Sequence, residues 1–227
     1  GPKKKTKFRK ESELRKTAYH EAGHAIVTHL LPDTDPVHQI SIIPAGRALG
    51  YTLNVPTEDK QSEYREELKE EISVLLAGRA AEVLTFGDFS GGASNDIERA
   101  TNIARKMVTQ LGMSDELGPI RYGQGGGDVF LGRDFSARQD YSGQTAAKID
   151  AEIKSIIKGS YDRAIEILRD NIDKLHFIAK FLHKNEVMDA EQFAAAMDGD
   201  PTFEDLEEMT ESKKRKSREE NDRRRAE

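Results

Sequence analysis

The sequence contains no cysteine among its 227 residues. Disulfide bonds and thiolate metal sites are therefore excluded, so any zinc ion must bind to histidine, aspartate or glutamate. No run reaches the roughly 20 apolar residues that a bilayer-spanning helix needs, and we expect no such helix within this sequence. The net charge of -6 at pH 7 argues against a dedicated nucleic-acid binder, and we expect no nucleic-acid partner.

Charge and apolar spacing divide the chain into three parts. Residues 1–12 are basic and polar and are predicted to form a linker. Residues 13–198 carry apolar residues at regular spacing, which predicts one globular domain. Residues 199–227 mix acidic and basic side chains with few apolar ones. This charged tail is predicted to be disordered, with a solvated helix as the alternative.

The domain is predicted to have a mainly α fold with a small β-sheet. Several segments repeat apolar residues every three or four positions, which is the period of a helix with one buried face. We expect helices over residues 13–31, 62–84, 94–112, 142–169, 172–183 and 190–197. Residues 38–42 and 49–55 alternate polar with apolar on either side of a turn at 44–47, which predicts two neighbouring strands.

The strongest chemical signal is the sequence His-Glu-Ala-Gly-His at residues 20–24. On a helix, His20 and His24 lie on one face about one turn apart, so both imidazoles can bind one metal ion. Catalytic zinc takes three protein ligands and a water molecule, whose pKa it lowers to about 7. Glu21 points about 100° away round the helix, where it can take a proton from that water without binding the metal. Two histidines at this spacing also arise by chance, so the prediction depends on a third ligand.

Two carboxylates are candidates for the third ligand. Asp96 follows the turn Gly91-Gly92 and lies in the first turn of a predicted helix with Ser94 as its N-cap. The N-terminus of a helix favours an ionised carboxylate, although an aspartate there is also ordinary helix chemistry. Glu82 lies late in the preceding helix, where it can bind the metal or accept a hydrogen bond from a ligand imidazole. The residues favour Asp96 and keep Glu82 as its rival.

Several blocks of the sequence resemble, in order, the FtsH-type AAA proteases. The first is Thr-Ala-Tyr-His-Glu-Ala-Gly-His-Ala at residues 17–25, which is similar to the zinc-motif helix of that family. Further blocks lie at residues 32–38, 41–44, 46–51, 76–82, 92–101, 112–115 and 117–118. The resemblance covers about residues 13–185 and is specific, because it comprises several ordered blocks.

The resemblance implies a zincin-type helical metallopeptidase domain over residues 13–198. It implies one Zn²⁺ per chain on His20, His24 and Asp96. Glu21 becomes the catalytic base, and Glu82 becomes a supporting acidic residue near the site. The implied activity is that of a zinc-dependent endopeptidase that degrades unfolded or membrane-extracted polypeptides as a homohexamer.

The resemblance also implies an AAA ATPase module and a transmembrane segment upstream of this region. The sequence has no Gly-x-x-x-x-Gly-Lys-Ser/Thr phosphate loop, so ATP would act only through that separate module. The full-length protein is then expected in the bacterial inner membrane, with this domain in the cytoplasm. A mitochondrial or chloroplast membrane is the alternative.

Residues 46–54 are predicted to bind the substrate. An extended polypeptide can pair with an exposed strand edge through main-chain hydrogen bonds, which suits an enzyme that cuts many sequences. The candidate contact residues are Gly46, Leu49, Gly50 and Tyr51, and the two glycines are expected to let the substrate backbone approach closely.

A second possible function is a non-catalytic scaffold. In that interpretation the apolar helix stripes assemble a ring, and the metal site is structural. Glu21 argues against it, because a structural zinc site needs no base beside its ligands.

Overall fold

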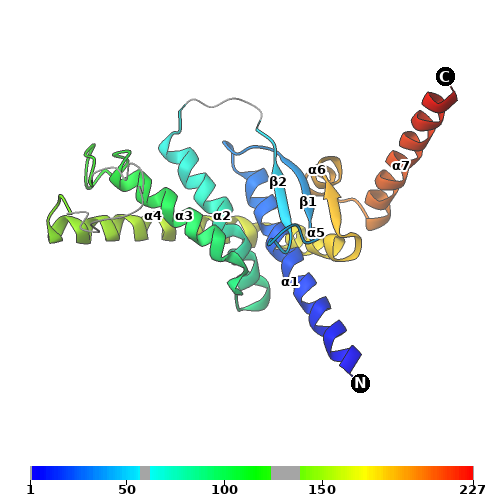
Figure 1. Cartoon of the computed structure of the whole chain (residues 1–227), viewed down its shortest axis with the longest axis horizontal. Helices are drawn as coiled ribbons and strands as arrows, with labels where there is room; N and C mark the ends of the chain where they lie inside the picture. The colour runs from blue at the N-terminus through cyan, green and yellow to red at the C-terminus, as the bar shows by residue number, and fades with distance from the viewer. Residues whose placement is uncertain (1, 57–61, 124–138, 227) are drawn as a thin grey trace, which may run out of the picture.

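The computed structural model describes residues 2–56, 62–123 and 139–226, and for residues 2–9 it describes the backbone alone. Helices dominate, and one small antiparallel sheet lies beside them (Figure 1). The elements in chain order are α1 (Pro2–Leu30), β1 (Val37–Ser41), β2 (Tyr51–Asn54), α2 (Arg65–Phe86), the 3-10 turn η1 (Gly91–Ala93), α3 (Ser94–Thr109), α4 (Gly143–Asp170), α5 (Ile172–Asn185), β3 (Val187–Asp189), α6 (Ala190–Asp198) and α7 (Phe203–Ala226). The predicted fold class is confirmed.

Helices α1 and α2 pack closely at the centre of the molecule. A Cβ at Gly23 of α1 would lie 2.7 Å from the carbonyl oxygen of Ala77 and 2.7 Å from Cβ of Ala81. Ala22 and Ala25 on α1 are also fully buried. Small side chains therefore let the two backbones approach, which brings the metal motif of α1 against α2.

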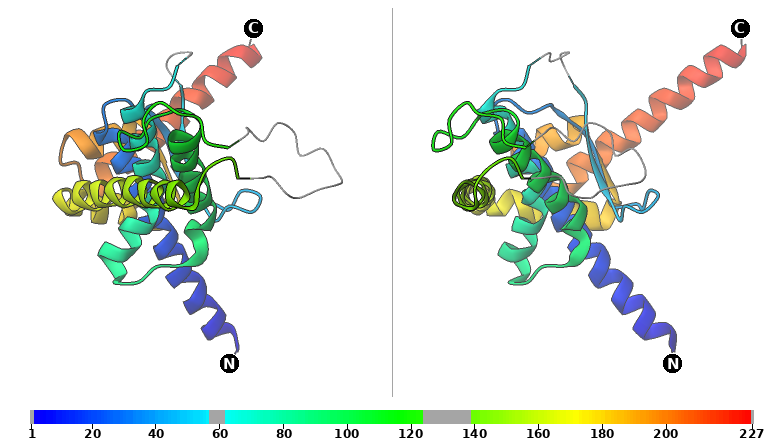
Figure 2. Two further views of the ribbon diagram at one scale, coloured as in Figure 1. Left: turned by 90° about the vertical axis from the view of Figure 1, so that its left-hand side faces the viewer. Right: turned by 60° about the vertical axis from the view of Figure 1, so that its left-hand side comes forward.

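Helix α2 lies between two hydrophobic clusters. Ala77 and Ala80 pack into a cluster with α1, α5 and the sheet. Ile72 and Leu76 pack into a second cluster with α3 and α4. Helix α4 lies across α2 and α3 and completes this second cluster (Figure 2). The metal motif on α1 and the start of α3 thus approach α2 from its two sides.

The sheet has three strands in the order β2-β1-β3, and each pair is antiparallel. Strands β1 and β2 are the predicted pair, with Ile40 opposite Thr52 and Ser41 opposite Tyr51. Strand β3 was not predicted, and it pairs with β1 so that Met188 lies opposite Ile40. Within the described residues, β2 is therefore an edge strand with one side unpaired.

Helix α1 begins at Pro2, well before the predicted helix start at residue 13, so the segment predicted to be a linker is helical. The lysines, arginines and glutamates of this segment are good helix formers, and no glycine or further proline interrupts them before Gly23. Their charge indicated exposure to water and did not argue against a helix. The N-terminal part of α1 projects from the body as a continuation of the metal-motif helix (Figure 1).

The charged tail is helical, so the solvated-helix alternative describes it better than disorder. Leu206 near the start of α7 is fully buried. Gln192 of α6 donates hydrogen bonds of 2.8 Å to the Leu206 carbonyl and of 2.8 Å to the Thr210 hydroxyl. Farther along, Arg224 pairs with Glu220 one turn away at 2.6 Å, a spacing that favours helix. Packing of the body therefore continues past residue 198, and the outer part of α7 projects into solvent (Figure 1).

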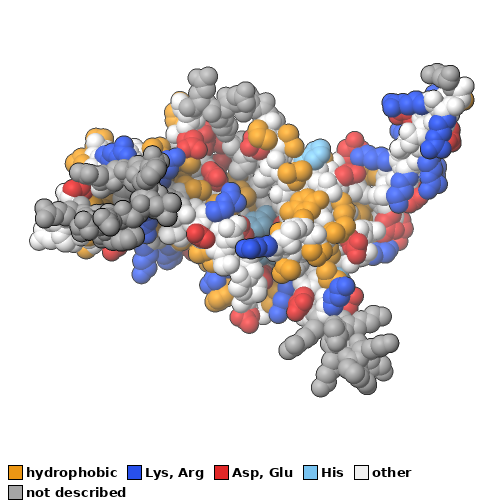
Figure 3. Space-filling view, in the orientation of Figure 1, with side chains coloured by type: hydrophobic (Ala, Val, Ile, Leu, Met, Phe, Trp, Pro, Cys, Tyr) orange, Lys and Arg blue, Asp and Glu red, His pale blue; other side chains and the backbone are white. Residues whose placement is uncertain are grey.

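The surface of α7 differs from the surface over the sheet in the kinds of side chain that it exposes (Figure 3). Acidic and basic side chains mix along α7, whereas hydrophobic side chains gather over the sheet. Leu49 is 64% exposed and Leu53 is 45% exposed. Among the described helices, none has both the length and the apolar character needed to cross a membrane.

Candidate metal centre

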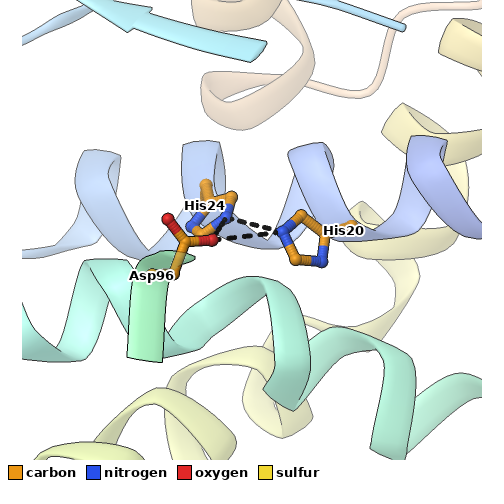
Figure 4. Close-up of side chains that lie close together, drawn as sticks. All are labelled: His20, His24 and Asp96. Atoms are coloured by element: carbon orange, nitrogen blue, oxygen red, sulfur yellow. Dashed lines mark hydrogen bonds and ion pairs between the residues drawn. The ribbon is translucent and has the colours of Figure 1, made fainter. Parts of the chain in front are cut away.

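Three possible ligand atoms from two helices meet at one point. Helix α1 presents Nε2 of His20 and of His24, and the first turn of α3 presents Oδ2 of Asp96 (Figure 4). The two Nε2 atoms are 3.0 Å apart, and Oδ2 of Asp96 lies 3.4 Å from the first and 3.3 Å from the second. In the described part of the chain, this is the one group of three histidine or acidic side chains close enough to share a metal ion.

These separations fit a zinc ion. Ligands that lie about 2.0–2.1 Å from a tetrahedral zinc are about 3.3 Å from one another. The separations of 3.0, 3.3 and 3.4 Å lie around that value. Two imidazoles and one carboxylate are also a donor set that zinc accepts. The described residues offer three ligands, which leaves a fourth position open, as in catalytic zinc sites.

Each histidine is oriented through its other ring nitrogen. Nδ1 of His24 donates to the carbonyl oxygen of Val74 at 2.7 Å, and Nδ1 of His20 donates to Oε2 of Glu82 at 3.4 Å. Because Nδ1 carries the proton in both rings, each Nε2 keeps its lone pair for a metal. Glu82 thus lies on the far side of His20 from Asp96, in the position of a supporting residue.

One face of α2 supports both histidines. A Cβ at Gly78 would lie 2.4 Å from Nε2 of His20, so the ring packs directly on the α2 backbone there. Val74, Gly78 and Glu82 are four residues apart, which places them on successive turns of one face. Sequence reasoning missed Val74, which acts through its backbone, and Gly78. A glycine inside a predicted helix is a usable signal of close contact, since it costs about 1 kcal/mol relative to alanine.

Ser90 joins the supporting carboxylate to the segment that carries Asp96. Its hydroxyl donates to Oε1 of Glu82 at 2.8 Å and accepts from the backbone N–H of Gly92 at 3.2 Å. Gly92 belongs to η1, which continues directly into α3. The prediction of Ser94 as an N-cap is wrong, because η1 supplies the preceding turn and Ser94 is already the first residue of α3. Ser90 caps η1 instead.

The electrostatics of the group favour charged carboxylates. Burial lowers the pKa of His20, but hydrogen bonds with Asp96 and Glu82 outweigh this effect and raise the pKa to about 9. Burial raises the pKa of Asp96, but hydrogen bonds with His20 and His24 outweigh it and hold the pKa well below its ordinary value. A second proton on His20 and a metal ion would therefore compete for the lone pair of its Nε2.

Glu21 is buried between α1 and the edge strand. Oγ1 of Thr52 lies 3.0 Å from Oε2 of Glu21 and 3.1 Å from its backbone oxygen. A Cβ at Gly50 would lie 3.1 Å from Cγ of Glu21 and 2.8 Å from the carbonyl oxygen of Ser41. Gly50 therefore allows the chain entering β2 to pack on α1, and its role in admitting a substrate backbone stays a prediction. No signal in the residues pointed to Thr52.

The ligand atoms line a cleft of about 1350 Å³. Strand β2 and the loop before it form one wall, and α2 with the start of α3 forms the other. Figure 3 shows histidine side chains in a hollow beside the sheet. Of the predicted contact residues, Leu49, Gly50 and Tyr51 line the cleft, whereas Gly46 lies in the turn outside it with φ of 61°. Asn54 also lines the cleft, and its buried Oδ1 has no hydrogen-bond partner in the described part of the chain.

A family model and the curated relatives that match this chain all describe peptidases. The model of the family described as Peptidase family M41 matches residues 7–196. The ATP-dependent zinc metalloprotease FtsH 1 of a Thermoanaerobacter species is 52% identical over 200 residues, which is 88% of this chain and 33% of the relative. The ATP-dependent zinc metalloprotease FtsH of Bacillus subtilis is 49% identical over 199 residues, or 87% of this chain and 31% of the relative.

A third relative is the ATP-dependent zinc metalloprotease FtsH of Thermotoga maritima. It is 49% identical over 193 residues, which is 85% of this chain and 32% of the relative. The chain thus spans about a third of the length of the curated relatives it matches. The resemblance predicted from the sequence blocks is confirmed, and the chain belongs to peptidase family M41.

Proposed function

We propose that this chain is the zinc-dependent endopeptidase module of a larger protein. The observation that carries the proposal is the convergence of His20, His24 and Asp96 at zinc-ligand spacing, with Glu21 beside them in the same cleft. Membership of a peptidase family and the words "zinc metalloprotease" in the names of the relatives support it. A zinc ion held there would supply a Lewis acid for the scissile carbonyl and for water.

Glu21 is the group that would move the proton. Hydrolysis adds water across the C–N bond, so one proton must leave the water and reach the leaving amine. Glu21 follows His20 by one residue, so its carboxylate leaves α1 in a different direction from the ligand imidazoles and lines the cleft. The carboxylate takes the proton at one oxygen and delivers it to the amine nitrogen as the bond breaks.

The substrate would bind as an extended strand along β2. The unpaired side of this edge strand offers main-chain hydrogen bonds that do not depend on side chains. Leu49 and Tyr51 line the cleft beside it. Gly46 at the neighbouring turn is a more distant contact in this proposal.

The first experiment tests Glu21. Glu21→Gln keeps the shape of the side chain and removes its basicity, so we expect one zinc per chain and loss of at least about a hundredfold in kcat. Metal analysis and cleavage of a fluorogenic peptide by the zinc-loaded chain measure the two effects. Wild-type turnover in the variant contradicts the base assignment. A zinc-loaded wild-type chain without any peptidase activity favours the scaffold alternative.

A second experiment separates Asp96 from Glu82. We expect Asp96→Ala to abolish stoichiometric zinc binding, because it removes a ligand atom. Glu82→Ala removes a hydrogen bond to His20 and should weaken zinc binding by only about 10–100-fold. Chelator competition measures both affinities. If Glu82→Ala empties the site and Asp96→Ala does not, the two roles are reversed.

The remaining proposals concern the whole protein, of which this chain matches about a third in its relatives. We propose a homohexamer with an AAA ATPase module and a transmembrane segment upstream, acting on unfolded or membrane-extracted polypeptides. The bacterial origin of the named relatives supports the bacterial inner membrane, with this domain in the cytoplasm, over an organelle membrane. Native mass spectrometry of the zinc-loaded chain tests the assembly, and a sixfold mass is the expected result.

A further inference from the structure

The strand that borders the cleft is in direct contact with the candidate base. The Thr52 hydroxyl lies 3.0 Å from Oε2 of Glu21 and 3.1 Å from the backbone oxygen of the same residue. A hydroxyl has one hydrogen and donates to one of these acceptors at a time. The backbone oxygen lies inside α1, where the helix ladder already supplies it with a donor. The carboxylate is the better acceptor, because a hydrogen bond to an ionised group is stronger.

The residue immediately before β2 touches the same side chain. Residues 50 and 52 are two apart, so they face the same side of the strand. Gly50 approaches the Glu21 side chain so closely that a Cβ would lie 3.1 Å from its Cγ. The chain entering β2 therefore meets the stem of Glu21 at Gly50, and β2 itself meets the carboxylate at Thr52.

We propose that Thr52 is a positioning residue that holds the Glu21 carboxylate in its working orientation. Through this contact the strand along which the substrate would lie also fixes the base. A ligand that pairs with β2 and orders it thereby orders Glu21. The inference deepens the proposed function and rests on it.

The hydroxyl is expected to affect turnover more than binding. Glutamate has three rotatable side-chain bonds, so a carboxylate without a partner distributes among several rotamers and spends less time where it can accept a proton. Because the Thr52 side chain faces α1, it lies away from the strand's main-chain hydrogen-bonding edge. Loss of the hydroxyl should therefore lower kcat and leave KM nearly unchanged.

The test compares three variants of the zinc-loaded chain. Thr52→Val keeps the branched shape and removes the hydroxyl, and we expect kcat for a fluorogenic peptide to fall about tenfold to a hundredfold, with KM within about twofold. Thr52→Ser keeps the hydroxyl and should retain kcat within about threefold of the wild type. The matched control is Thr101→Val on α3, whose hydroxyl donates to the Ile97 carbonyl at 2.8 Å outside the cleft, and it should change neither constant.

Zinc content and melting temperature are measured for every variant, so that a folding defect is recognised. Crystal structures of the wild type and Thr52→Val give a readout that does not depend on activity. The Glu21 carboxylate should be ordered toward residue 52 in the wild type and spread over several rotamers in the variant. An unchanged or raised kcat in Thr52→Val, or an equally ordered carboxylate, overturns the inference. A zinc-loaded wild type that cleaves no peptide defeats the proposed function instead, while the crystallographic comparison still decides the role of Thr52.

Discussion

Ser90 contacts residues beside the candidate metal site and is not one of its three grouped ligands. Its hydroxyl holds Glu82, which orients His20, and it also caps the η1 turn that leads to Asp96. One small side chain thus connects residues on two different helices that meet at the same point. Partners of this kind contribute to metal affinity by keeping the ligands in place before the metal arrives.

Replacement of Ser90 should weaken zinc binding more than it weakens the fold. We expect Ser90→Ala to lower zinc affinity about tenfold, because it releases the Glu82 carboxylate and the η1 turn together. Ser142→Ala is the matched control, since Ser142 caps α4 by accepting from the backbone of Thr145 far from the cleft. It should lose about 1 kcal/mol of stability and keep its zinc affinity. Chelator competition and thermal unfolding of both variants provide the comparison, and equal zinc affinities would exclude this role for Ser90.

Sequence reasoning reached some residues of the site and not others, for a physical reason. His20 and His24 were predicted because both lie on one helix, where a spacing of four residues fixes their geometry. The choice between Asp96 and Glu82 stayed open, since it depends on which side of His20 each helix approaches. Thr52 and the Val74 carbonyl were missed, because a hydroxyl in a strand and a backbone oxygen carry no pattern along the sequence.

At the scale of elements, the crossing of α1 and α2 sets the position of the imidazoles. We expect Gly78→Ala to displace the His20 ring, because the new Cβ would lie 2.4 Å from Nε2. The variant should lose stoichiometric zinc. Gly159→Ala on α4 is the control, since a Cβ there meets nothing within 4 Å. It should bind zinc normally and gain about 0.5–1 kcal/mol of stability, because alanine is the better helix former.

Metal analysis and chemical denaturation of these two variants test the crossing. Normal zinc content in Gly78→Ala would mean that α1 and α2 can separate without disturbing the ligands.

The elements themselves were predicted to different degrees. The helices between residues 62 and 198 were predicted within a few residues, because each repeats apolar residues over several turns. Strand β3 has three residues, too few to display an alternating pattern. The N-terminal part of α1 and the whole of α7 were interpreted as a linker and a tail because they are charged. Charge reports contact with water, whereas the helix propensity of lysine, arginine and glutamate determined the backbone conformation.

At the scale of the whole molecule, the body extends into the first turns of α7. Leu206 is fully buried against the core that contains α1, α5 and the sheet. We expect Leu206→Ala to cost about 2–5 kcal/mol of stability, as other buried leucines do. Glu220→Ala on the projecting part of the same helix removes one exposed ion pair with Arg224 and should change stability by less than about 1 kcal/mol. Urea unfolding of both variants locates the C-terminal boundary of the packed body. Equal stabilities of the two variants would place this boundary before α7.

The common face of Val74, Gly78 and Glu82 determines which changes of chain length this protein can tolerate. The three residues serve the two histidines on successive turns of α2. Insertion or deletion of one residue between Val74 and Gly78 would rotate everything beyond it by about 100° relative to Val74. The Val74 carbonyl, the space left by the missing side chain of Gly78 and the Glu82 carboxylate could then no longer all face α1. Length variation among relatives is therefore expected in the loops on either side of α2, and the length of this stretch of helix should be invariant.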